Sequence, residues 1–259
     1  MVIAGTGLND IWVIDVRRGM TTRVTSGPAG ASNFVWSPDG KELIYNRKSE
    51  ARMAFHRQEL RAGAVPSELR EAAGRGWPEE WSQDGKVLLY RRAGEENGVW
   101  ALPLEGKGEP ELVLKTEFPV ARARVSPDGR WVAYMSRESG GLEVYVEPLP
   151  RRGERVRVSR DGGEQPRWRG DGKELFYLSH KGRLMAVPFG DGTRGAEVGV
   201  PEELIAADTL RAVMGDPFGD YDVTPDGERF LIKRRLDREE KQRIHLLTNW
   251  TSLLDRQPQ

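Results

Sequence analysis

A four-residue turn signal recurs five times along this chain, each time between two apolar runs. The clearest copy is FVWSPDGKELIY, and the others read EEWSQDGKVLLY, ARVSPDGRWVAY, PRWRGDGKELFY and YDVTPDGERFLI. Proline presets the backbone for the second position of a type I turn, Asp bonds nearby amides, and Gly adopts the left-handed conformation. Each copy therefore predicts a tight β-hairpin with a glycine bulge, and not an active-site loop.

The repeats are spaced as in a β-propeller. The aspartates of the five turns are Asp39, Asp84, Asp128, Asp171 and Asp226, so successive copies lie 45, 44, 43 and 55 residues apart. A period in the forties with several strands in each unit is typical of a propeller with one four-stranded blade per repeat. The sequence therefore predicts an all-β fold built of four-stranded antiparallel blades.

Apolar residues recur at fixed positions around each turn. Three residues before the Asp stand Trp36, Trp81, Val125, Trp168 and Val223. Six residues after it stand Tyr45, Tyr90, Tyr134, Tyr177 and Ile232. The strand after each turn is apolar at successive positions, which indicates burial on both of its faces. Inner strands of a propeller need this pattern because they lie between neighbouring blades.

The strand count predicts a single six-bladed propeller domain over residues 1–259. Four complete blades occupy residues 29–207, a last blade with an insert occupies 208–259, and a partial first blade occupies 1–28. The partial blade lacks its inner strand, which would leave an unpaired edge, so we expect further sequence upstream of Met1 in the natural protein. A five-bladed ring that joins the terminal pieces is the less favoured alternative, since RIHLLTNW and IWVIDV both have the pattern of third strands.

Composition limits the classes of function. Forty basic and forty acidic residues give a formal net charge of zero, so no overall field favours nucleic acid or an anionic membrane. Cysteine is absent, which excludes disulfides, thiol nucleophiles and cysteine-ligated zinc. No apolar run approaches the roughly 20 residues of a membrane-spanning helix, and the start MVIAGTGLNDIW lacks the features of a signal peptide. We expect no nucleic-acid partner and no membrane segment in this chain.

Catalytic motifs are absent from the sequence. The three histidines, His56, His180 and His245, have no adjacent Ser or Asp in a recognisable catalytic setting. The G-x-S-x-G elbow, the Walker loop, the H-E-x-x-H motif and the kinase loops are also missing. The Asp-Gly turns do not have the ligand spacing of an EF-hand. We therefore expect no catalytic residue, no metal site and no cofactor.

Charged residues near the start of the inner strands form one candidate binding site. An inner strand enters the central channel of a propeller at this point, near one mouth. The candidate residues are Trp77, Glu79, Glu80, Arg122, Arg124, Arg167, Asp220 and Asp222. Charges at equal register in adjacent blades can bind a charged ligand or a partner's peptide, or they can form interblade ion pairs that stabilise the ring. The aromatic member of the set can likewise serve recognition or packing.

The repeats resemble the WD40-like, or TolB-like, propeller repeats of bacteria over essentially the whole chain. The C-terminal part, an irregular insert that ends in GERFLIKR and is followed by RIHLLTNWTSLL, looks like the end of propellers attached to bacterial serine/threonine kinases. In that arrangement a membrane helix commonly separates the kinase from a propeller outside the cytoplasm. The resemblance therefore implies an extracytoplasmic location, and it identifies no ligand.

Three functional hypotheses follow. The first is a non-catalytic binding or scaffolding propeller, the sensor or interaction domain of a longer bacterial signalling protein, with a protein or small-molecule ligand at the channel mouth. The second is a TolB-like periplasmic envelope component, although that family also carries an N-terminal α/β domain and an export signal. The third is a hydrolase that uses the channel carboxylates Glu79, Glu80, Asp220 and Asp222. It would need a pair of them about 5–9 Å apart for glycoside chemistry. The arginines at the same register disfavour it, because they hold carboxylates ionised.

Overall fold

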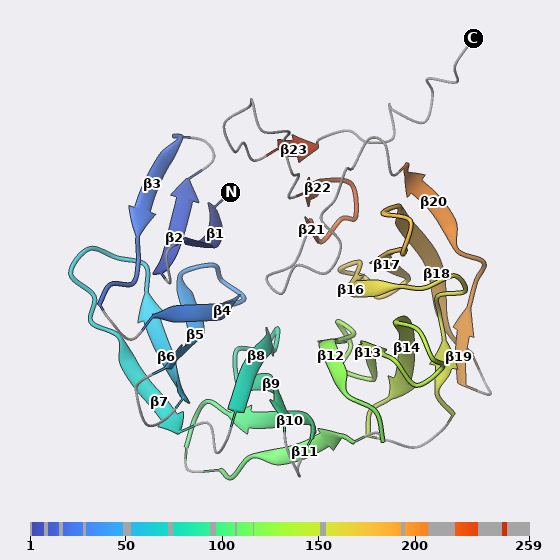
Figure 1. The fold of residues 1–259 in the computed structure, drawn as a ribbon, viewed down its shortest axis with the longest axis horizontal. Coiled ribbons are helices and arrows are strands. Elements are labelled where there is room, and N and C mark those ends of the chain that lie inside the picture. Colours follow the sequence, from blue (N-terminus) through green and yellow to red (C-terminus); the bar gives the residue numbers. More distant parts are fainter. Residues whose placement is uncertain are drawn as a thin grey trace. The chain divides into compact units, whose positions relative to one another are not determined.

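The computed structural model describes the chain except for residues 1, 8–9, 16–17, 28–29, 49–52, 72–74, 94–96, 107, 116, 151–153, 193–194, 207–220, 233–244 and 248–259. The chain divides into two compact units, Met1–Thr116 and Glu117–Gln259. The elements of regular secondary structure in the described residues are all β-strands. These strands form six antiparallel sheets (Figure 1).

The first unit contains three of these sheets. The first has three strands in the order β1 (Val2–Gly7), β2 (Asp10–Asp15) and β3 (Met20–Arg23). The second has four, β4 (Ala31–Trp36), β5 (Glu42–Lys48), β6 (Met53–Glu59) and β7 (Ser67–Glu71). The third also has four, β8 (Arg75–Trp81), β9 (Val87–Ala93), β10 (Gly98–Pro103) and β11 (Glu111–Leu114).

The second unit contains the other three sheets. The first consists of β12 (Val120–Val125), β13 (Trp131–Ser136), β14 (Glu143–Pro148) and β15 (Val156–Arg157). The next consists of β16 (Glu164–Trp168), β17 (Glu174–Leu178) and β18 (Leu184–Gly192), with both β19 (Gly195–Val198) and β20 (Glu202–Ile205) paired to β18. The last described sheet consists of β21 (Tyr221–Val223), β22 (Phe230–Ile232) and β23 (His245–Leu247).

These sheets confirm the prediction of an all-β chain with four-stranded antiparallel units. In five of the six described sheets the strand order follows the chain, as it does in the blade of a propeller, and in the remaining one β20 pairs with β18 instead of β19. The sequence analysis missed β19, which extends β18 into a separate hairpin with Phe189 opposite Val198. In the part of the chain that the structure describes, only β18 pairs with two later strands in this way, so the repeat pattern gave no signal for β19.

The predicted hairpin turns have the expected geometry. Gly40 has a φ of 69° and donates its backbone N–H to the Ser37 carbonyl oxygen at 2.9 Å. Asp39 accepts hydrogen bonds from the Ser37 hydroxyl at 2.7 Å and from the Lys41 N–H at 3.1 Å. These two bonds, the Ser37 bond first, hold the pKa of Asp39 below its usual range. The glycines of the other four turns, Gly85, Gly129, Gly172 and Gly227, have φ values of 76°, 75°, 72° and 78°.

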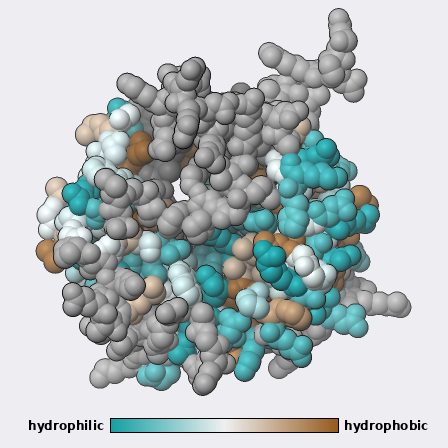
Figure 2. All heavy atoms as spheres, viewed as in Figure 1, coloured by the Kyte–Doolittle hydropathy of each residue, from teal (hydrophilic) through white to brown (hydrophobic). Residues whose placement is uncertain are grey.

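Neighbouring sheets within each unit pack through the apolar faces that the register predicted. In the first unit, Phe55 of β6 meets Tyr90 of β9 edge to face, with ring centroids 5.2 Å apart. In the second unit, Phe176 of β17 meets Phe230 of β22 in the same way, at 5.1 Å. Hydrophilic residues make up most of the described surface on the face drawn in Figure 2. Consecutive residues of the second strands are buried, as Leu43, Ile44 and Tyr45 of β5 are, so these strands are covered on both faces, as their sequence indicates.

A buried carboxylate depends on one of the repeat tyrosines. The Tyr134 hydroxyl donates a 2.6 Å hydrogen bond to Glu147 Oε1, and the glutamate is only 2% exposed. We expect Tyr134→Phe to lower the free energy of unfolding by about 1–3 kcal/mol, because a buried carboxylate oxygen loses this donor. Tyr145→Phe is the control, since that hydroxyl donates to Ser139 Oγ in a partly buried site. Urea denaturation measures both variants, and an equal loss in the two would contradict the expectation.

Candidate functional site

A β-bulge interrupts the inner strands β4, β8, β12 and β16 at equivalent positions, next to the predicted site residues. The strand register shifts between Ser32 and Phe34, Pro78 and Glu80, Ala121 and Arg124, and Glu164 and Arg167. In three of these bulges a non-glycine residue has a positive φ, namely Asn33 (44°), Arg122 (57°) and Gln165 (56°). A left-handed conformation costs such a residue about 1 kcal/mol or more, and such strain is often found at functional sites.

Three of the predicted residues lie together on β8 in the first unit. The Arg91 Nε atom lies 3.3 Å from Glu79 Oε1, and the Glu79 side chain is 5% exposed. The Arg91 guanidinium also lies 4.3 Å from the centroid of the Trp77 ring, which is opposite it in the β8–β9 pair. Glu80 lies on the same strand and is half-buried. Arg91 therefore engages both Glu79 and Trp77 within one sheet.

Two arginines of the second unit take the same pose on neighbouring inner strands. Arg124 of β12 donates to the Ala123 carbonyl oxygen at 2.7 Å, and Arg167 of β16 donates to the Pro166 carbonyl oxygen at 3.0 Å. Arg167 Nε also lies 3.4 Å from Asp222 Oδ1 on β21. This contact is an ion pair between two sheets, as one of the two sequence interpretations predicts. Because the Asp222 side chain is 66% exposed, the pair contributes little stability.

A buried tyrosine, Tyr221, lies close to Arg167, whose guanidinium is 5.8 Å from the centroid of its ring. The Tyr221 hydroxyl donates a 2.9 Å hydrogen bond to the carbonyl oxygen of Gln165, the strained residue of the β16 bulge. Burial raises the pKa of Tyr221, and the positive charges of Arg167 and Arg124 act in the opposite direction. Arg167 and Arg124 stand on adjoining inner strands, since Trp168 of β16 donates to the Arg124 carbonyl oxygen of β12.

Side-chain hydrogen bonds also join neighbouring sheets near the inner strands. Trp168 Nε1 donates to the Arg124 carbonyl oxygen at 3.0 Å, which connects β16 to β12. With the Tyr221 bond to Gln165, this contact connects β12, β16 and β21. In the first unit, Asn46 Nδ2 donates to the Gly76 carbonyl oxygen at 3.1 Å and connects β5 to β8. The β16 bulge therefore also has a structural role, because its Gln165 carbonyl oxygen accepts the hydrogen bond from Tyr221 of the next sheet.

The structure divides the predicted site residues between the two units. Trp77, Glu79 and Glu80 belong to the first unit, and Arg122, Arg124, Arg167 and Asp222 belong to the second. Asp220 lies outside the described residues. Sequence reasoning missed Arg91 and Tyr221. Arg91 could have been found from its cross-strand position opposite Trp77, whereas the long-range contact of Tyr221 left no signal in the pattern.

Metal-binding clusters and membrane-spanning helices are two features that can indicate a function. Among the described residues, no three His, Asp or Glu side chains lie close enough together to hold a metal ion. In the same part of the chain, no helix has the length and hydropathy needed to cross a membrane.

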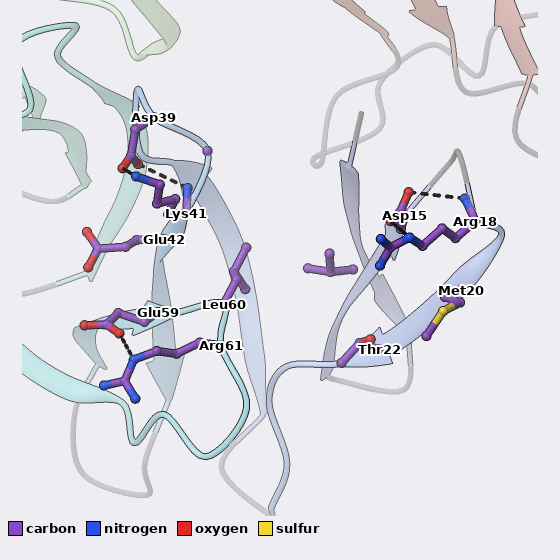
Figure 3. A pocket seen from close by; sticks show the side chains of 12 residues that line it. Asp15, Arg18, Met20, Thr22, Asp39, Lys41, Glu42, Glu59, Leu60 and Arg61 are labelled. Carbon is purple, nitrogen blue, oxygen red and sulfur yellow. Dashed lines mark hydrogen bonds and ion pairs between the residues drawn. The ribbon is translucent and has the colours of Figure 1, made fainter.

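A cavity of about 750 Å³ forms a second candidate site in the first unit, and sequence reasoning did not find it. It lies between the β2–β3 hairpin and the β4–β5 turn, and charged residues line much of it (Figure 3). The repeat pattern gives no signal for it, because its two walls come from two different repeats.

Comparison with known proteins shows one short sequence match. No protein-family model matches the chain. A stretch of 88 residues, 33% of the chain, is 36% identical to part of tricorn protease homolog 1 of Streptomyces coelicolor. This stretch covers 8% of that protein.

Solved structures show a more extensive likeness. TolB from Acinetobacter baumannii matches 88% of this chain with a TM-score of 0.67 and 17% identity, and the chain spans 54% of that protein's length. A putative TolB from Agrobacterium tumefaciens matches 86% of this chain, with 76% of its own length covered, a TM-score of 0.65 and 21% identity. An oligogalacturonate lyase in complex with manganese matches 95%, with 73% of its own length covered, a TM-score of 0.59 and 14% identity.

These matches establish the fold. The chain is a TolB-like β-propeller built of antiparallel sheets, as the SPDG-type repeats predicted. At these identities the structural likeness concerns the fold alone. The number of blades, the domain limits and the resemblance to kinase-attached propellers stay predictions.

Proposed function

We propose that this propeller is a non-catalytic binding module that recognises an acidic segment of a partner protein. The observation that carries the proposal is the position of Arg124 and Arg167 on neighbouring inner strands. The Arg167 guanidinium lies 5.8 Å from the centroid of the Tyr221 ring, and Trp168, the next residue, donates to the Arg124 carbonyl oxygen. Each guanidinium is oriented by a carbonyl group of its own strand, so it is already positioned before a ligand binds. Guanidinium groups match the geometry of carboxylates. Asp222, the ion-pair partner of Arg167, has a side chain that is 66% exposed, so a ligand carboxylate can displace it at small cost.

The carboxylates of the candidate site support binding more than catalysis. Glu79 is engaged by Arg91 and Asp222 by Arg167, which is the arrangement of structural ion pairs. A glycosidase-type reaction needs two carboxyl groups on either side of one bond. An enzyme is the less favoured alternative, and fold neighbours such as the oligogalacturonate lyase keep it under consideration.

The wider role that fits this module is that of a sensor or interaction domain within a longer signalling protein. A TolB-like envelope component is the second candidate, which the likeness to two TolB structures favours. The resemblance to TolB and to kinase-attached propellers supports a location outside the cytoplasm. In both roles, the arginine pair would recognise the partner.

The test is the binding of a fluorescently labelled deca-glutamate peptide, followed by fluorescence anisotropy at low and moderate salt. We expect binding that weakens with salt, and a loss of about tenfold or more in Arg124→Gln or Arg167→Gln, since each removes a charged hydrogen-bond donor. Arg157→Gln is the control, because Arg157 is exposed on the outer strand β15 of the same unit. Thermal unfolding verifies that each variant is folded. Equal affinity in all variants, or equal binding of a deca-lysine peptide, would overturn the proposal.

A further inference from the structure

A carboxylate of the second unit already binds one member of the arginine pair. Asp222 of β21 places its Oδ1 atom 3.4 Å from Arg167 Nε. The same oxygen accepts the Val223 N–H at 3.0 Å, so the backbone of β21 helps to hold the carboxylate in this position. Asp222 therefore contacts Arg167 in the way that a carboxylate of a ligand would contact it.

The other neighbours of Arg167 belong to the folded sheets. Its guanidinium lies 5.8 Å from the centroid of the Tyr221 ring, and Tyr221 is only 5% exposed. The guanidinium also donates to the Pro166 carbonyl oxygen at 3.0 Å. The Arg167 side chain is 14% exposed, whereas that of Asp222 is 66% exposed. A ligand therefore meets Asp222 first, and it gains Arg167 by replacing this side chain.

This replacement exchanges one ion pair for another of the same kind. Exposed ion pairs contribute little, so the exchange gives a ligand carboxylate almost no net gain. The ligand also loses translational and rotational freedom when it binds. A ligand with a single carboxylate therefore has very little net attraction to Arg167.

A second carboxylate on the same ligand changes this balance. Arg124 stands on the adjoining inner strand, since Trp168 Nε1 donates to the Arg124 carbonyl oxygen at 3.0 Å. Because the first contact has already restricted the ligand, a second contact in the same complex adds to the affinity at a high effective concentration. Two carboxylates that reach the two arginines together are therefore bound much more tightly than one.

We propose that Asp222 is an internal competitor, which makes the arginine pair accept only ligands with two closely spaced carboxylates. This inference rests on the proposed function, and it specifies which acidic segments the site recognises. A group that opposes weak ligands is a common source of specificity. Peptides with glutamates at alternate positions fit, because alternate side chains of an extended peptide point to the same side.

Asp222→Asn tests the competitor, because asparagine keeps an oxygen for the Val223 N–H and removes the charge. The probes are two amidated, fluorescently labelled peptides of glycine and serine, one with a single glutamate and one with Glu-Ser-Glu. Fluorescence anisotropy measures their affinities. We expect the unsubstituted protein to bind the two-acid peptide at least about tenfold more tightly than the one-acid peptide. Asp222→Asn should bind both peptides about threefold more tightly or better, since no ion pair has to be exchanged.

Glu203→Gln is the matched control. Glu203 forms an ion pair with Arg183 at 2.7 Å in the same unit, and its substitution changes the net charge equally. We expect this variant to bind both peptides as the unsubstituted protein does. A second control combines Asp222→Asn with Arg167→Gln. In that background the gain should disappear, because Asp222 acts through Arg167.

The outcomes separate this inference from the proposed function. No gain in Asp222→Asn, although the unsubstituted protein binds deca-glutamate, overturns the inference and leaves the proposed function standing. An equal gain in Glu203→Gln, or a gain that persists with Arg167→Gln, also overturns it, because general repulsion then accounts for the effect. If the unsubstituted protein does not bind deca-glutamate, the proposed function fails and this inference fails with it. Thermal unfolding verifies that each variant is folded.

Discussion

Replacement of Phe176 by alanine is expected to lower the free energy of unfolding by about 3–5 kcal/mol. Phe176 is fully buried, with 0% exposure, and belongs to a cluster that joins the β16–β20 sheet to the β21–β23 sheet. Its ring meets Phe230 edge to face at 5.1 Å. Truncation would leave a cavity between two sheets that cannot close without moving one of them.

Phe118→Ala is the matched control for this substitution. It lies in the same unit and is 42% exposed, so we expect a change within about 0.5 kcal/mol. Urea denaturation followed by tryptophan fluorescence measures both variants. A loss of less than about 1 kcal/mol for Phe176→Ala would mean that the position is not wedged between sheets.

Substitution of Gly170 by proline is expected to destabilise the protein by about 2–4 kcal/mol, although three of the five repeats carry proline at this position. The Gly170 N–H donates to the Pro225 carbonyl oxygen of the next repeat turn at 2.8 Å, and proline has no N–H. A Cβ atom at residue 170 would also lie 2.6 Å from that oxygen. Gly170→Ala keeps the donor and adds only the clash, so it should have a smaller effect.

The equivalent substitution at Gln83 should have the opposite sign. Gln83 is exposed, and its turn has the same hydrogen bond from the Gly85 N–H to the Ser82 carbonyl oxygen, at 2.9 Å, as the proline-containing turns. We expect Gln83→Pro to stabilise the protein by about 0.4–1 kcal/mol, because it restricts the unfolded chain. Chemical denaturation of Gly170→Pro and Gln83→Pro measures the two changes in the free energy of unfolding. The same sign at both positions would contradict the contact between the turns at Gly170 and Pro225.

Most of the fold could be predicted because its determinants are local and repeated. The Asp-Gly pair fixes each turn, and the apolar positions around Asp171 fix which faces of β16 and β17 are buried. The same information sets the strand order, since consecutive strands pair as hairpins. The β18–β19 extension could not be predicted, because it belongs to one repeat only.

The candidate site was only partly predictable, because its contacts join distant segments. The register identified Arg167 and Asp222 as neighbours, and the structure brings them to 3.4 Å. The positive φ of Arg122 has no counterpart in the sequence, since arginine does not favour that conformation and proline stands at the equivalent position 78. The cavity beside Met20 is formed by residues of two different repeats, so no periodic signal marks it.

Side-by-side packing of neighbouring sheets through their second strands is the central claim, and a double-mutant cycle on Phe176 and Phe230 measures it most directly. The single variants Phe176→Leu and Phe230→Leu and the double variant are compared by urea denaturation. We predict a coupling free energy of about 0.5–1.5 kcal/mol, because the two rings meet edge to face across the contact between sheets. Strictly additive effects, with a coupling near zero, would show that the two strands do not touch and would contradict the account.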